Sequence, residues 1–201
     1  MKQNEVRIVG GTWRSRRVRF PDRAGLRPTP DRVRETLFNW LGQDLTGLAC
    51  LDLFAGSGAL GFEAASRGAA RVVMVENDRA AHESLRANRD ALEAAQVELV
   101  RTDALEFLRS ARAAGRQYDV IFADPPFTAD YWPRLVPLLP RCMAPDARVY
   151  CESGAPVEWP ADWEVVKSGR AGQVTFQLVK WMAHEPHGDL PGDVRSDHAR
   201  S

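Results

Sequence analysis

Hydrophobic positions in the central part of the chain switch repeatedly between two spacings. Short apolar runs of strand length alternate with longer segments in which apolar residues recur at helical spacing. The expected strands are Ala49–Leu53, Arg71–Glu76, Val97–Arg101, Tyr118–Ala123 and Ala147–Glu152. The expected helices are Gly58–Arg67, Arg79–Ala95, Ala104–Ala114 and, broken by three prolines, Tyr131–Arg141. This alternation predicts an α/β fold built on a doubly wound parallel sheet.

The segment Glu5–Phe20 has a different pattern, with apolar side chains at every second position on both sides of Gly10-Gly11. These side chains are Val6, Ile8, Val18 and Phe20. A period of two predicts a β-hairpin, and a lone hairpin is too small to be stable. We therefore expect the hairpin to pack on the main body or to clamp a ligand.

A helix is expected from Asp31 to about Leu41. Thr29 as N-cap and Pro30 as the first helical residue mark its start. Its apolar face is formed by Val33, Leu37, Trp40 and Leu41. Another face carries polar side chains that are available for contacts outside the core, namely Arg32, Glu35 and Asn39.

The chain is expected to end in a second hairpin and a tail. Trp163–Lys167 and Val174–Trp181 are strand-like and flank a short segment that contains glycine. A parallel sheet that ends in an antiparallel hairpin is the layout of class I (Rossmann-like) methyltransferases. Residues 183–201 have no hydrophobic periodicity, which predicts a disordered tail.

Composition narrows the class of protein. Hydrophobic residues make up 44% of the chain and charged residues 27%, as in ordinary soluble globular proteins. No stretch approaches the roughly 18 consecutive apolar residues of a membrane span, and the N-terminus lacks the apolar core of a secretory signal. Cys50, Cys142 and Cys151 have no metal-ligand spacing and sit among apolar residues, which predicts buried, reduced thiols. These observations favour a cytoplasmic protein.

The formal net charge of zero hides a strong asymmetry. Residues 1–34 hold ten basic and three acidic side chains, a net charge of +7, so the other 167 residues sum to −7. Nine of those ten basic residues are arginines. A basic arm on an acidic body favours contact with nucleic acid over a merely solvated surface.

The segment Leu51–Gly61 is the strongest local motif, because it follows a strand and opens a helix. Its glycines satisfy the GxGxxG pattern of dinucleotide-binding proteins, and Glu76 follows about 20 residues after them. Asp52 separates two interpretations, since a carboxylate at the strand end repels a pyrophosphate. S-adenosylmethionine (AdoMet), with an ammonium, a sulfonium and no phosphate, suits this loop better. The expected contacts are Asp52, Phe54, Ala55, Gly56, Ser57 and Gly58.

Acidic residues at the next two strand ends extend this candidate site. Glu76, followed by Asn77, can accept hydrogen bonds from both ribose hydroxyls of a nucleoside. Asp103 is placed to accept from an adenine amine, with the Ala104 N–H near a ring nitrogen. Asp78 and Asp103 also precede helices, so each could instead be an N-cap.

Asp124-Pro125-Pro126-Phe127 at the tip of the fourth expected strand carries the chemistry. An exocyclic amine on a base is a poor nucleophile, because its lone pair is delocalised into the ring. The Asp124 carboxylate and the Pro125 carbonyl can bind both amine protons and localise that lone pair for attack on a methyl group. The two prolines stiffen the loop, and Phe127 offers a face on which a flipped base can stack. The alternative is an ordinary proline-rich turn.

Other chemistries find less support in the sequence. A cytosine-C5 transfer needs a nucleophilic cysteine near Asp124, and none is there. The four histidines fall on a helix and in the tail, so they form no triad and no metal cluster. We expect no metal cofactor.

Several motifs occur together and in order along the chain. They are Arg7–Gly11, Arg27–Thr29, Arg32–Asn39, Asp52–Gly61, Asp124–Phe127 and Ala171–Val174. In this combination the chain resembles the bacterial 16S ribosomal RNA (guanine-N2)-methyltransferases of the RsmD family over about residues 5–181. Ser15 stands where that family is expected to have glycine.

The resemblance implies transfer of a methyl group from AdoMet to N2 of one guanine, guanine 966, in 16S rRNA, with S-adenosylhomocysteine as the other product. It implies a basic, RNA-contacting extension over residues 1–43 and a methyltransferase domain over residues 44–182. The substrate is expected to be the small ribosomal subunit or a late assembly intermediate, and the enzyme a monomer. The expected RNA contacts are Arg7, Arg14, Arg16, Arg27, Thr29, Arg32, Arg34 and Asn39.

Three alternatives stay open at this point. An adenine-N6 methyltransferase acting on RNA or DNA can use the same D-P-P-aromatic loop, although no separate DNA-recognition domain is visible in these 201 residues. An RNA-binding assembly factor could keep the fold without the activity. An NAD oxidoreductase would explain the glycine pattern alone.

Overall fold

The computed structural model describes residues 3–22, 28–111, 115–126 and 131–182. Arg27, Phe127 and the expected tail at residues 183–201 lie outside these ranges. No helix in the described part of the chain is long and apolar enough to cross a membrane.

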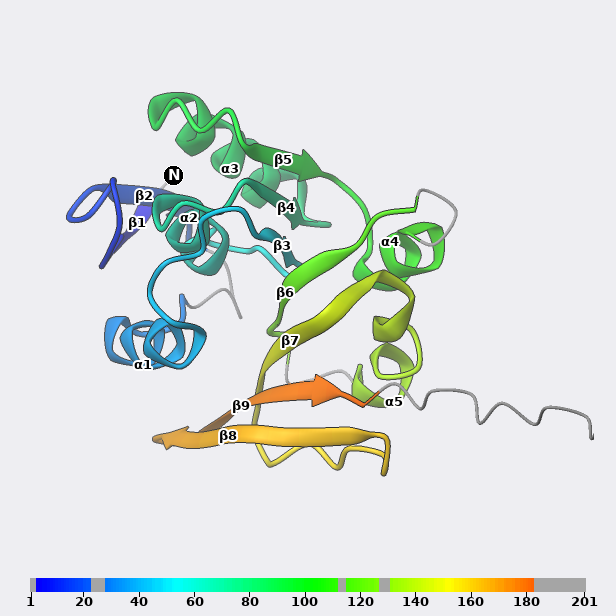
Figure 1. Cartoon of the computed structure of the whole chain (residues 1–201). Coiled ribbons are helices and arrows are strands. Elements are labelled where there is room, and N and C mark those ends of the chain that lie inside the picture. The colour runs from blue at the N-terminus through cyan, green and yellow to red at the C-terminus, as the bar shows by residue number, and fades with distance from the viewer. Residues whose placement is uncertain (1–2, 23–27, 112–114, 127–130, 183–201) are drawn as a thin grey trace, which may run out of the picture.

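A seven-stranded sheet forms the centre of the molecule, with the strand order β5-β4-β3-β6-β7-β9-β8 (Figure 1). Strands β3 to β7 pair parallel with one another, and β9 pairs antiparallel with both β7 and β8. Their bounds are β3 Ala49–Asp52, β4 Arg71–Val75, β5 Val97–Val100, β6 Tyr118–Ala123, β7 Met143–Ser153, β8 Trp163–Ala171 and β9 Val174–Trp181. This arrangement confirms the expected parallel sheet that ends in an antiparallel hairpin.

Helices cover both faces of the sheet. They are α2 Ala59–Ser66, α3 Arg79–Ala91, α4 Ala104–Ala111, the short α5 Trp132–Leu135 and a 3₁₀ helix at Leu139–Cys142. Successive strand residues point to opposite faces, so Val72 and Met74 join the core beneath α2, whereas Val73 and Val75 join the core beneath α4. The last two helices are short where prolines were expected to break a longer one.

The N-terminal hairpin packs on the body of the protein. Strands β1 Gln3–Arg7 and β2 Arg17–Pro21 form a separate two-stranded antiparallel sheet. The expected apolar side chains of this hairpin are buried in the same core as those of α2 and of the helix α1 (Asp31–Leu41). On α3, Asn88 Oδ1 accepts from Arg19 N at 3.0 Å, while Asn88 Nδ2 donates to Arg19 O at 2.7 Å. The hairpin therefore shares the core of the main body.

The turn of this hairpin lies flat against the end of α2. A Cβ at Gly11 would come within 1.9 Å of Ser66 O, and Gly11 has a φ of +72°. Ser15 has a φ of +71°, a left-handed conformation that favours glycine. This explains why glycine is the expected residue at position 15, since serine is strained there.

Helix α1 spans Asp31–Leu41, as its apolar spacing predicts. Its N-cap residue is Pro30, and no side chain caps its first N–H groups. The expectation that Thr29 caps this helix is therefore wrong, because the Thr29 hydroxyl instead donates to Glu152 Oε1 at 2.7 Å. Cys50, Cys142 and Cys151 are buried and free, as expected.

Candidate active site

Four acidic side chains lie at the carboxyl ends of four neighbouring strands. Asp52 ends β3, Glu76 follows β4, Asp124 follows β6, and Glu152 lies near the end of β7. The register aligns them, because Asp52 pairs with Met74 on one side and with Phe122 on the other, and Ala123 pairs with Cys151. The carboxyl edge of a doubly wound sheet is where such folds bind ligands.

The loop after β3 is shaped by glycine. Gly56 and Gly58 have φ angles of +49° and +80°. A Cβ at Gly58 would also come within 2.6 Å of the Phe62 ring and 2.7 Å of Leu85. Only glycine fits these conformations and this close approach without strain, so the chain turns sharply from β3 into α2.

Asp52 is almost completely buried, at 2% exposed, beneath this loop. Its Oδ2 accepts a hydrogen bond from Gly61 N at 3.0 Å, which ties the strand end to α2. Burial raises the pKa of Asp52 to about 7, although the hydrogen bonds from Gly61 and Phe54 oppose this shift. Asp52 therefore fixes the position of the loop, and its negative charge favours a cationic ligand next to the loop.

Replacing Asp52 by asparagine is expected to stabilise the ligand-free protein at pH 8. The carboxyl pKa is about 7 when folded and 3.8 as a free side chain, so wild-type stability falls as pH rises from 4 through 7. Asparagine keeps the acceptor for Gly61 and does not ionise. Urea unfolding should show a gain on the order of 2–4 kcal/mol at pH 8 that vanishes near pH 4. The same pH dependence in both proteins would contradict this assignment.

Glu76 closes the loop from the side of β4. Its Oε2 accepts from Gly56 N at 2.8 Å, and its Oε1 accepts from Asp78 N at 2.7 Å. Burial raises the pKa of Glu76, while these backbone hydrogen bonds oppose the shift. Each carboxylate oxygen has a second lone pair, so the residue can still accept from two hydroxyls. The Phe54 ring packs edge-on against Tyr131, with centroids 5.2 Å apart.

Asp103 and Asp78 are both N-caps of the helices that follow them, which is the alternative that the sequence left open for these two residues. Asp103 Oδ1 accepts from Leu105 N at 2.9 Å and from Glu106 N at 3.2 Å. Asp78 Oδ1 accepts from Ala81 N at 2.8 Å. These caps start α4 and α3 next to the site. A contact from Asp103 or the buried Ala104 to an adenine ring stays a prediction.

Asp124 lies half-buried directly after β6, with Pro125 buried and Pro126 exposed. Burial raises the pKa of Asp124 well above its ordinary value, and the charges of Glu152 and Asp52 raise it further. A carboxylate with a raised pKa is a stronger base than an ordinary one. Asp124 is therefore suited to take a proton from a bound group.

Glu152 is a site residue that the sequence did not single out. It is 4% exposed, and its Oε1 accepts from Thr29 Oγ1 at 2.7 Å and from Tyr150 OH at 2.9 Å. Burial raises the pKa of Glu152, whereas the two hydroxyl donors lower it. The one sequence signal was its position at the end of a strand neighbouring that of Asp124.

Most of the described residues expected to contact RNA lie on the surface of the N-terminal extension. Arg32 is exposed, Arg7 forms an exposed ion pair with Asp31 at 3.0 Å, and Arg16 Nη2 donates to Ala91 O at 2.8 Å. Thr29 is buried against Glu152 and does not belong to this surface.

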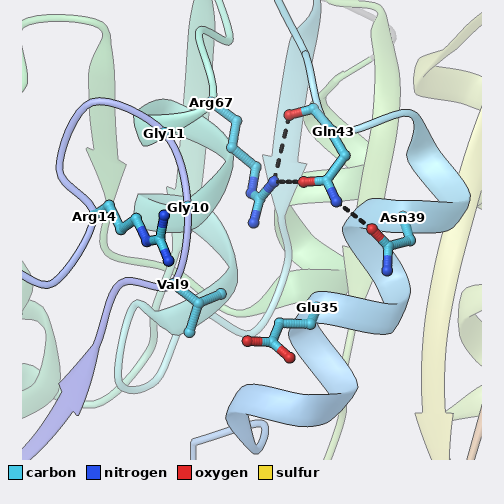
Figure 2. A pocket seen from close by; sticks show the side chains of 8 residues that line it. All are labelled: Val9, Gly10, Gly11, Arg14, Glu35, Asn39, Gln43 and Arg67. Carbon is cyan, nitrogen blue, oxygen red and sulfur yellow. Dashed lines mark hydrogen bonds between the residues drawn. The ribbon is translucent and has the colours of Figure 1, made fainter.

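Arg14 and Asn39 line a polar groove of about 600 Å³ between the hairpin turn and α1. Figure 2 shows that Gln43 connects Asn39 with Arg67: the Gln43 side chain donates to Asn39, and Arg67 donates to the carbonyl and the side-chain oxygen of Gln43. The remaining lining residues are Val9, Gly10, Gly11 and Glu35. Hydrogen-bonding groups from three separate elements therefore face one space.

The expectation that Arg34 faces RNA is wrong. Its side chain is completely buried, and its Nη1 contacts Glu63 Oε2 at 3.0 Å. Its Nε donates to Thr29 O at 3.1 Å, and its Nη2 donates to Arg7 O at 2.7 Å. Arg34 thus joins the hairpin, the chain before α1 and α2 from the inside. The physical reason is that a buried Glu63 requires a cationic partner.

The acidic edge and the open glycine loop fit AdoMet. The carboxylates of Asp52 and Glu76 attract the positive charges of AdoMet, on its ammonium and sulfonium groups, and repel a pyrophosphate. Asp52 and Glu76 would hold the loop and the ribose. Within the described ranges, no group of three or more His, Cys, Asp or Glu side chains is arranged to hold a metal ion.

The fold and this site define the class I methyltransferase architecture. A putative methyltransferase crystallised with S-adenosylhomocysteine shares that fold, with a TM-score of 0.61 at 16% identity over 74% of this chain and 48% of its own. A solved structure described as putative methyltransferase yhhF from Escherichia coli is more similar, with a TM-score of 0.81 and 41% identity over 90% of this chain and 100% of its own.

Sequence comparison narrows the class to one family. The family model described as conserved hypothetical protein 95 matches residues 6–180. Ribosomal RNA small subunit methyltransferase D of E. coli K12 is 41% identical over 195 residues, which cover 94% of this chain and 95% of the relative. The relative of the same name from Haemophilus influenzae is 38% identical over 184 residues, which cover 89% of this chain and 95% of the relative. The chain therefore belongs to the RsmD family.

Proposed function

We propose that this protein transfers a methyl group from AdoMet to the exocyclic N2 of a guanine in 16S rRNA, namely guanine 966 as the resemblance of its motifs implies. The observation that carries the proposal is the half-buried Asp124 beside the buried Pro125 at the end of β6, the strand next to β3 and its glycine loop. The relatives named as ribosomal RNA small subunit methyltransferase D support rRNA as the substrate.

The protein's part of the reaction is to activate a weak nucleophile. The Asp124 carboxylate and the Pro125 carbonyl would each accept one N–H of the guanine amine, which localises the nitrogen lone pair. AdoMet, when bound, supplies a methyl group on a positively charged sulfur. As the N–C bond forms, the bond between the methyl group and sulfur would break and S-adenosylhomocysteine would leave. The nitrogen must also lose one proton, and Asp124 would accept it because its raised pKa makes it the better base.

The basic N-terminal extension would hold the RNA around the target base. Exposed arginines on the hairpin and on α1 can contact phosphates, which positions the RNA without reading its sequence. The groove lined by Arg14 and Asn39 offers further hydrogen-bonding groups beside them. The guanine would be turned out of its loop to reach Asp124.

The test is methyl transfer from labelled AdoMet to small ribosomal subunits purified from cells that lack the enzyme, followed by nucleoside analysis. Labelled N2-methylguanosine at a single rRNA position is the expected result, and added salt should reduce the rate because phosphate contacts are screened. Labelled methyladenosine would overturn the assignment of the base. Absence of label from the rRNA, with AdoMet bound in a calorimetry experiment, would overturn the assignment of the substrate.

A further inference from the structure

Glu152 is a buried carboxyl group beside the reacting site with no role in the activation step. Strands β6 and β7 are parallel and in register, with Ala123 opposite Cys151. The residues that follow, Asp124 and Glu152, therefore occupy neighbouring positions at the carboxyl edge, where paired strands lie about 4.8 Å apart. Their proximity is reflected in the pKa of Asp124, which the charge of Glu152 raises.

Two hydroxyl groups orient the Glu152 carboxylate. Thr29 Oγ1 and Tyr150 OH both donate to Oε1, at 2.7 and 2.9 Å. Thr29 is itself held by Arg34, whose Nε donates to the Thr29 carbonyl at 3.1 Å. Hydrogen-bond donors of this kind favour the ionised carboxylate. Glu152 is thus held as an oriented acceptor whose second oxygen, Oε2, is not used by either hydroxyl.

The edge of guanine that carries the reacting amine matches two adjacent acceptors. N1–H and the N2 amine lie next to each other on that edge, and both are donors. Adenine differs from guanine at the ring nitrogen N1, which carries no hydrogen in adenine and is an acceptor beside the N6 amine. A carboxylate opposite N1 therefore binds guanine and repels adenine.

We propose that Glu152 determines base specificity by accepting the N1–H of the target guanine while Asp124 and the Pro125 carbonyl hold its N2 amine. Thr29 and Tyr150 are positioning residues, since they act through Glu152. This inference rests on the proposed function and deepens it, because the same site would then select the base as well as activate it. A site built to bind a substrate N–H rejects the analogue that lacks it, since the buried acceptor loses its partner.

The test compares guanine with 2,6-diaminopurine, which keeps the 2-amino group but has no hydrogen on N1. Small subunits are reconstituted with 16S rRNA that carries either base at the methylated position, introduced on a ligated synthetic segment. For the wild-type enzyme, kcat/KM is expected to be about 10- to 100-fold lower with 2,6-diaminopurine. The 2-amino group is present in both substrates, which differ at N1 and in the group on C6. The change of this ratio in a Glu152 variant therefore reports the contact at N1.

The variant Glu152→Gln should change this preference. Because Thr29 and Tyr150 both donate to Oε1, the amide oxygen is expected to take that position and the amide NH₂ to take the position of Oε2. The amide then donates to N1 of 2,6-diaminopurine and opposes N1–H of guanine. The ratio of the two kcat/KM values should fall to about one or below. Thr29→Val, which removes one orienting donor, should lower kcat/KM for guanine by about tenfold and reduce the ratio.

Controls separate a specificity effect from a folding effect. Glu158→Gln makes the same chemical change at an exposed position in the segment after β7, and its substrate ratio should equal that of wild type. AdoMet affinity and the midpoint of thermal unfolding are measured for every variant. A ratio that stays at the wild-type value in Glu152→Gln, or an equal loss with both bases, would overturn the inference. Failure of the wild-type enzyme to form N2-methylguanosine would instead overturn the proposed function.

Discussion

Replacing Asp124 by alanine is expected to lower the rate of methyl transfer by about 10²- to 10⁴-fold, the usual contribution of a positioned general base. The carboxylate is the group proposed to bind one amine proton and to remove it. AdoMet is expected to bind nearly as well as before, since the loop around Gly56 and Gly58 is held by Asp52 and Glu76. Single-turnover transfer and AdoMet calorimetry measure the two properties separately.

The pH profile gives this prediction a second measurement. Asp124 must be ionised to accept a proton, so the rate should fall as pH falls through its pKa, which lies well above that of an ordinary carboxyl. In Asp124→Asn this decrease should disappear along with most of the activity. Asp146→Asn, an exposed substitution near the start of β7 and away from the site, should leave rate and profile unchanged. Equal losses of AdoMet binding and of transfer in Asp124→Ala would contradict its role at the substrate amine.

Replacing Arg34 by alanine should destabilise the protein by about 3–5 kcal/mol, because it removes one cation from a buried charge network and leaves buried acceptors without their donors. Arg34 and Glu63 are both completely buried. Glu63 keeps Arg67, at 2.9 Å, and the Val9 N–H, at 2.8 Å, as partners. The main-chain carbonyls of Arg7 and Thr29 each lose a donor. Urea denaturation monitored by circular dichroism measures the change in the free energy of unfolding.

Arg32→Ala is the matched control for this prediction. Arg32 lies on the same helix two residues earlier, and its side chain is exposed, so its removal should change stability by no more than about 0.5 kcal/mol. Arg34→Lys keeps the charge but cannot reproduce the several directed hydrogen bonds of a guanidinium, so it should fall between wild type and Arg34→Ala. Comparable stability of Arg34→Ala and Arg32→Ala would show that the buried network does not hold the hairpin to the body.

The main elements of the fold were predictable because they depend on local spacing. Tyr118–Ala123 is both the expected and the observed span of β6, and α1 covers the expected Asp31–Leu41. The strand ends then place Asp52 and Asp124 at one edge of the sheet without any further information. The roles of such residues toward ligands cannot be predicted in this way, since they depend on groups that are not neighbours in sequence.

Arg34 shows how a local interpretation can fail. The family resemblance implies an RNA contact for Arg34, and the strongly basic first 34 residues agree with a surface position. Yet positions 34, 37, 38 and 41 share one helical face, and Leu37 and Phe38 on that face are buried. This spacing was a signal that Arg34 points inward. What the spacing alone could not supply is its partner, Glu63, which lies 29 residues further along the chain.

The amino-acid sequence by itself determined the order of strands and helices, the glycine loop and the acidic strand ends, because these follow from backbone preferences and short-range periodicity. Only the tertiary structure decided which acid stands beside which. Thr29 and Glu152 are 123 residues apart in sequence, and their hydroxyl–carboxylate contact exists because the chain just before α1 lies against the end of β7. A hydrogen bond between distant residues depends on the packing of whole elements, which no local pattern encodes. The candidate guanine-reading group was therefore visible only in the folded chain.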